Sequence, residues 1–310
     1  MDPLGVVVRF GLYLNLMILF GAPLFGIYSP QPRDRRRVAL RVLRRLYAAG
    51  AVVGLALSLV SLMVLAASMS GQSVGDVRWS TLEMLVLQTN IGWAWLVRVA
   101  ALTAFILASW VMHPARGAGP TLMSLLGGVA LASLAWTGHG AMDQGSIGLV
   151  HLSADIVHLL AAGAWIAAIL ALGTLLIRVH RSMSRDDAEH LHRALARFAT
   201  IGTLAVALLF LTGLVNSWLL VGISGLASVG DSLYLQLLAL KLLLFLGMLC
   251  LAAANRFTIT PTLERVLRTG EQGSALAHLR RSLAIEASLG IAILGLVAWF
   301  GTLNPPSAGM

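Results

Sequence analysis

Eight stretches of the chain are apolar enough and long enough to cross a lipid bilayer. They cover residues 4–28, 46–69, 91–112, 120–138, 150–177, 196–221, 233–254 and 281–302. A helix needs about 20 apolar residues to span the hydrocarbon, and only 11% of the 310 residues are charged. Because backbone polar groups must pair internally in lipid, these stretches predict an all-α, polytopic integral membrane protein. We expect a bundle of about eight transmembrane helices that forms a single domain over residues 1–310.

Two details refine this layout. The stretch 79–90 is too polar to span, so we expect it at the membrane surface or leading into the third span. Gly50 and Gly54 lie in the second span, and small residues allow helices to pack closely in a membrane.

Basic residues mark alternate loops. The chain has 22 basic and 13 acidic residues, and all basic residues except Arg9, Arg78, Arg98 and Lys241 lie in or beside the loops 29–45, 113–119, 178–195 and 255–280. Cytoplasmic loops are enriched in Lys and Arg, so these loops are expected in the cytoplasm and both termini outside. A basic excess can indicate nucleic-acid binding, but this alternation favours the lipid bilayer as partner and no nucleic acid.

Several function classes lack support. Cys250 is the single cysteine, so the chain offers no disulfide framework and no thiolate metal cluster. No nucleophile elbow, phosphate loop or metalloprotease motif occurs, and we expect no enzyme activity. Five histidines fall in the loops expected in the cytoplasm, and we interpret them as solvated polar residues: His113, His180, His190, His192 and His278.

One helix face carries two histidines and a carboxylate. In "VHLSADIVHLL", Asp155 lies about 40° from His151 around the helix, and His158 about 20° on the other side. The two histidines are two turns apart, about 10.5 Å, so one ion cannot readily use both. We predict two metal sites along this face. The outer site consists of His151 with His139 and Met142, and the deeper site of His158 with Asp155 and a group from another helix. Imidazole and thioether donors suit copper.

Other ionisable residues lie within the spans, where they are costly and indicate function. Arg9, Arg98, Asp155, His158 and Lys241 all fall in the outer half of their spans, and we expect them to share one pocket. Arg98 is a candidate partner for Asp155. Near the inner end, Glu286 lies close in height to Asn255, Arg256 and Arg197, which favours a structural ion pair over a cytoplasmic exit gate.

The order of several stretches resembles the copper resistance protein D family. "ADIVHLLAAGAW" (154–165) is similar to its signature helix, and "GWAWLVRVA", "TGHGA", "ARFATIGTLAVALLFLTG", "LLALKLLLFLGMLCLAAANRFTITP" and "LRRSLAIEASLGIAILGLVAWFGTLNPP" continue the likeness over most of the chain. The family pattern marks the following residues: Arg98, His139, Asp155, His158, Trp165, Lys241, Asn255, Arg256 and Glu286. Alanines replace the family's usual glycines after Trp165, which alters helix packing more than ligand chemistry.

The resemblance implies a multi-pass protein of the bacterial inner membrane with periplasmic termini. It would transport copper, from the periplasm towards the cytoplasm, in copper homeostasis or resistance. A small periplasmic copper-binding protein is the implied partner. Two alternatives remain open: a haem b-binding electron-transfer protein, in which buried arginines pair with propionates, and a copper sensor or assembly factor that does not transport.

Overall fold

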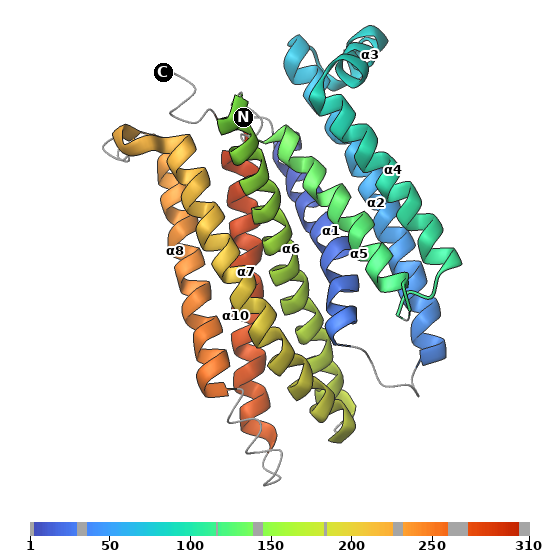
Figure 1. The fold of residues 1–310 in the computed structure, drawn as a ribbon, viewed down its shortest axis with the longest axis vertical. Coiled ribbons are helices and arrows are strands. Elements are labelled where there is room, and N and C mark those ends of the chain that lie inside the picture. The colour runs from blue at the N-terminus through green and yellow to red at the C-terminus, as the bar shows by residue number, and fades with distance from the viewer. Residues whose placement is uncertain are drawn as a thin grey trace.

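The computed structural model describes residues 3–29, 36–115, 117–138, 145–182, 185–225, 232–259 and 272–303. Within these ranges every regular element is a helix, so the all-α prediction is confirmed. The long helices run alongside one another in a bundle (Figure 1). They are α1 (Pro3–Tyr28), α2 (Arg36–Ser70), α3 (Trp79–Gln88), α4 (Asn90–Val111), α5 (Gly119–Ala132), α6 (Gly145–Ser182), α7 (Arg185–Gly225), α8 (Leu233–Ala254) and α10 (Gln272–Phe300).

Eight helical segments of the described chain are long and apolar enough to cross a membrane, which confirms the predicted number of spans. The fourth of them is α5 continued by a short 3-10 helix, η3 (Ser133–Thr137). The polar stretch 79–90 forms α3 and leads through Thr89 into α4. The chain is therefore a multi-pass membrane protein.

Several helices extend beyond the apolar segments that predict them. The loop expected at 178–195 is mostly helix, because α6 continues to Ser182 and α7 begins at Arg185. The helices also include four histidines expected in loops. His180 lies on α6, His190 and His192 lie on α7, and His278 lies on α10, so their loop assignment is wrong. His190 is only 7% exposed. Hydropathy reports which residues suit lipid, whereas a helix continues into water as long as its backbone hydrogen bonds are favourable.

Helix α1 lies at the centre of the packing. It contacts α2, α5, α6 and α10, and so joins the two large apolar clusters of the bundle. The approach of α1 to α6 depends on Gly21, where an added Cβ would lie 2.4 Å from the Cβ of Ala167. At the α1–α2 contact a Cβ on Gly54 would lie 2.8 Å from Asn15 Oδ1, and Asn15 donates a hydrogen bond to Gly50 O. Small residues thus permit close helix packing, as expected for Gly50 and Gly54.

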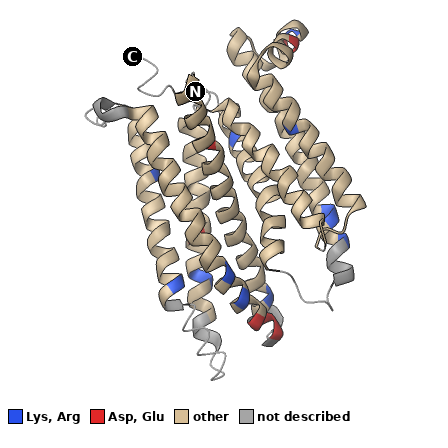
Figure 2. Ribbon diagram, in the orientation of Figure 1, with Lys and Arg blue, Asp and Glu red and all other residues tan. Residues whose placement is uncertain are grey.

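Charge is distributed unevenly along the bundle. Figure 2 shows most of the coloured Lys and Arg residues at the end where α6 meets α7, opposite the N-terminus. Helix α7 packs on α6, and α8 packs on α10. The candidate site lies between these two pairs of helices.

Candidate functional site

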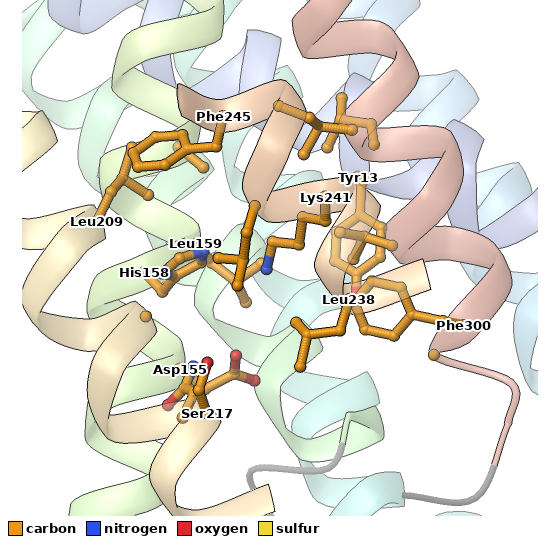
Figure 3. Close-up of a pocket in the computed structure, with 18 of the residues that line it drawn as sticks. Tyr13, Asp155, His158, Leu159, Leu209, Ser217, Leu238, Lys241, Phe245 and Phe300 are labelled. Carbon is orange, nitrogen blue, oxygen red and sulfur yellow. The ribbon is translucent and has the colours of Figure 1, made fainter. Parts of the chain in front are cut away.

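A cavity of about 460 Å³ lies among α1, α6, α7, α8 and α10. Most of its wall is apolar. The polar side chains on the wall come from four helices and are Arg9, Tyr13, His151, Asp155, His158, Asn216, Ser217, Tyr234 and Lys241. Figure 3 shows His158, Asp155 and Lys241 facing the same space.

The polar face of α6 lines this cavity. His151, Asp155 and His158 all contribute to the wall, as the helical spacing predicts. His151 is 1% exposed, so it is buried rather than a solvated rim residue. Among the described residues no three His, Cys, Asp or Glu side chains are grouped so that they could hold a metal ion. The α6 face is therefore a series of donors along the cavity.

The predicted outer metal site is only partly described. His139 and Met142 lie outside the described residues. Gly138 lies on the cavity wall, and a Cβ added to it would lie 3.4 Å from Asp155 Oδ2. The end of η3 thus passes directly beside the carboxylate of Asp155.

Two of the expected cations line the cavity and each has a defined contact. The guanidinium of Arg9 donates to the carbonyl oxygens of Gly301 and Thr137, which ties α1 to the chain after α10 and to η3. The ammonium of Lys241 lies 5.8 Å from the centre of the Phe300 ring, within the range of a cation–π interaction. Backbone carbonyls and an aromatic face therefore offset part of the positive charge beside Asp155.

Arg98 does not join this group. It is 2% exposed on α4, which packs on α2, α5 and η3, and it is not among the residues that line the cavity. Among the described residues, its Nε and Nη1 atoms have no hydrogen-bond partner. The expectation that all five ionisable residues line one pocket is therefore wrong for Arg98, whose link to the cavity is an electrostatic interaction with Tyr13 on its wall.

A second polar cluster surrounds Glu286, which lies one helical turn before Gly290, the first residue of α10 on the cavity wall. Glu286 is 2% exposed and accepts a hydrogen bond from Asn255, the first residue of the π-helical turn η6 (Asn255–Ile259). Arg256 donates to Thr203 Oγ1 and to Ala199 O on α7, and Arg197 donates to Tyr28 O. Among the described contacts Glu286 thus has an amide partner, and the two arginines have other acceptors.

Three residues at or beside the cavity are not indicated by the sequence pattern. Met17 on α1 and Met248 on α8 add thioether sulfurs to the wall. Thr212 on α7 lies 2.9 Å from His158, measured from its Oγ1 to the imidazole Nδ1. Thr212 is one of few polar residues in a long apolar stretch of α7, and that isolation is the only sequence signal for it.

Known proteins match the chain over its full length. The pattern described as "Copper resistance protein D-like, N-terminal domain" matches residues 1–149, and the pattern "Copper resistance protein D" matches residues 192–300. Copper resistance protein D of Pseudomonas syringae pv. tomato is 44% identical over 312 residues, covering 100% of this chain and 99% of that protein.

Two more distant relatives agree with this match. Inner membrane protein YebZ of Escherichia coli (strain K12) is 27% identical, over 97% of this chain and 98% of its own length. Copper transport protein CutJ of Bacillus subtilis (strain 168) is 27% identical, over 95% of this chain and 52% of its own length. The chain therefore belongs to the copper resistance protein D family.

Proposed function

We propose that this protein takes up copper ions in the cavity and passes them across the bacterial inner membrane towards the cytoplasm. The observation that carries the proposal is the series His151, Asp155 and His158, which lines one cavity from a single face of α6. Membership of the copper resistance protein D family supports copper as the cargo.

The donors on the wall suit this cargo. Imidazole and thioether ligands favour copper over hard ions, and the wall offers His158 and His151 together with Met17 and Met248. The two histidines lie two turns apart on α6, so an ion would move between successive sites instead of using both at once. Arg9 and Lys241 on the same wall would weaken the hold on a cation, which favours passage over permanent retention.

The charge distribution supports the orientation. The end of the bundle that is rich in Lys and Arg (Figure 2) is the end expected in the cytoplasm. On that basis both termini lie in the periplasm, the α6 face descends from the periplasmic side, and the Glu286–Asn255 contact lies on the cytoplasmic side of the cavity. A relative is named as an inner membrane protein, which supports this membrane as the location. A small periplasmic copper-binding protein would then deliver the ion.

Transport is tested by reconstituting the full chain in lipid vesicles that contain a copper-responsive dye. Copper(I) added outside should reach the dye much faster than in protein-free vesicles, and vesicles sorted by protein orientation should show flux from the periplasmic face. Copper that binds to the purified protein without any flux would contradict transport and favour the sensor or assembly role.

A second candidate function is haem binding. Phe210 and Leu214 of α7, and Leu242 and Leu246 of α8, line the cavity and are exposed. An apolar macrocycle would find an apolar wall between α7 and α8. His158 would supply an axial ligand, and Arg9 or Lys241 a partner for a propionate.

Absorbance distinguishes the two functions. We expect the protein purified from haem-replete cells to be colourless and to contain copper after incubation with copper(I), as measured by elemental analysis. A Soret band that disappears in His158→Ala would instead establish the haem function and contradict copper as the cargo of this cavity.

A further inference from the structure

The buried contact between His158 and Thr212 joins α6 to α7 beside the cavity. Thr212 is 8% exposed, and its Oγ1 lies 2.9 Å from Nδ1 of His158. The same oxygen lies 2.6 Å from Leu208 O, four residues earlier on α7, and 3.4 Å from Leu209 O. Three polar atoms therefore surround a hydroxyl group that has a single hydrogen.

The positions of these atoms decide which group donates. A carbonyl oxygen can only accept, so the short contact with Leu208 O requires the hydroxyl hydrogen of Thr212. The hydroxyl oxygen is then left to accept a hydrogen bond from Nδ1–H of His158. In the opposite arrangement Thr212 would donate to Nδ1, and its oxygen would face Leu208 O at 2.6 Å without a hydrogen between them. Two unshielded acceptors at that distance repel each other.

The proton on Nδ1 determines what the other nitrogen can do. A neutral imidazole with its hydrogen on Nδ1 carries a lone pair on Nε2, and a metal ion needs that lone pair. His158 lines the cavity, and the nearest atom of the ring to Gly213 is Cε1, 3.9 Å from where a Cβ would be. Because Gly213 has no side chain, it places no atom against Cε1, the ring carbon that is bonded to both Nδ1 and Nε2.

We infer that Thr212 is a positioning residue that holds His158 as the Nδ1–H tautomer and so presents Nε2 to the copper ion in the cavity. The part of this inference that concerns copper rests on the proposed function. The part that concerns the tautomer does not, because the hydrogen bond exists without any metal. Partners of this kind fix the orientation of a ligating histidine and raise its basicity.

The test measures the tautomer in the metal-free, full-length protein. Histidine is labelled with ¹⁵N, and the His158 signals are identified by their loss in His158→Ala. The signals should show a protonated Nδ1 and an unprotonated Nε2 in the wild type. Thr212→Val has nearly the same shape but no hydroxyl, so it should shift the ring towards the Nε2–H tautomer. Thr212→Ser keeps the hydroxyl and should restore the wild-type signals.

The matched control is Thr103→Val on α4. Thr103 makes the same bond to the carbonyl four residues earlier, Val99 O at 2.8 Å, but it is exposed, and none of its described hydrogen bonds involves a histidine. This variant should leave the His158 signals unchanged. A wild-type ring protonated on Nε2, or a Thr212→Val protein that keeps the Nδ1–H tautomer, overturns the inference.

Copper binding gives the second readout. Loss of an outer partner of a ligating histidine lowers metal affinity by about 10- to 100-fold, and Thr212→Val should lose affinity for copper(I) by that factor. Thr212→Ser and Thr103→Val should bind as the wild type does. Equal affinity of Thr212→Val and the wild type contradicts the inference, whereas a wild-type protein with the expected tautomer and no copper binding contradicts the proposed function instead.

Discussion

Replacing His158 with alanine is expected to lower the affinity for copper(I) by about a hundredfold, at or beyond the upper end of the loss caused by removing an outer-sphere partner. The residue lines the cavity and its Nδ1 lies 2.9 Å from Thr212 Oγ1, so we expect it to be the strongest copper ligand on α6. His151→Ala should have a smaller effect, because His151 lies two turns further out. Both affinities are measured by competition with a copper(I)-binding dye.

A control variant shows whether the loss of any imidazole lowers the affinity for copper(I). His278→Ala is the control, because His278 is exposed on α10 and does not line the cavity. The thermal unfolding temperature of each variant in detergent shows whether the fold is retained. Equal affinities for His158→Ala and the wild type, in a folded protein, would contradict the assignment of His158 as the principal copper ligand.

The membrane architecture can be predicted from the sequence because a bilayer imposes a simple requirement. Each span needs a long apolar run, and the chain contains eight of them. The face of α6 can also be predicted, since the spacing of His151, Asp155 and His158 fixes their angles around one helix. Both features depend only on residues that are near one another in the sequence.

Contacts between helices cannot be predicted in the same way. Most spans are apolar on all sides, so the local pattern does not show which side of α1 faces α6 and which faces α2 and α5. Arg98 and Arg9 have similar depths, yet only Arg9 lines the cavity. Thr212, Met17 and Met248 come from three other helices, and only the packed structure shows that they lie at or beside the same cavity.

The inner cluster illustrates the same limit. Similar heights suggest that Glu286 pairs with an arginine, but height leaves the direction of each side chain open. In the structure the amide of Asn255 contacts Glu286, and Arg256 reaches Thr203 on α7. Asn255 and Arg256 lie in the π-helical turn η6, and such turns are rare and hard to infer from sequence.

Substituting Gly21 with alanine is expected to destabilise the protein by about 2–3 kcal/mol, the upper part of the range for overpacked cores. The added Cβ would lie 2.4 Å from the Cβ of Ala167 and 2.6 Å from the carbonyl oxygen of Gly163, and neither atom can rotate away. Helices α1 and α6 must then separate, which also displaces the donors on α6.

Gly26→Ala on the same helix is the control. The added Cβ meets nothing within 4 Å, so this variant should be neutral or slightly stabilising, because alanine favours a helix. Thermal unfolding of both variants measures the difference, and the double variant Gly21→Ala with Ala167→Gly should recover part of the loss since it removes the closest clash. If Gly21→Ala unfolds at the same temperature as Gly26→Ala, the close α1–α6 contact that supports the cavity is wrong.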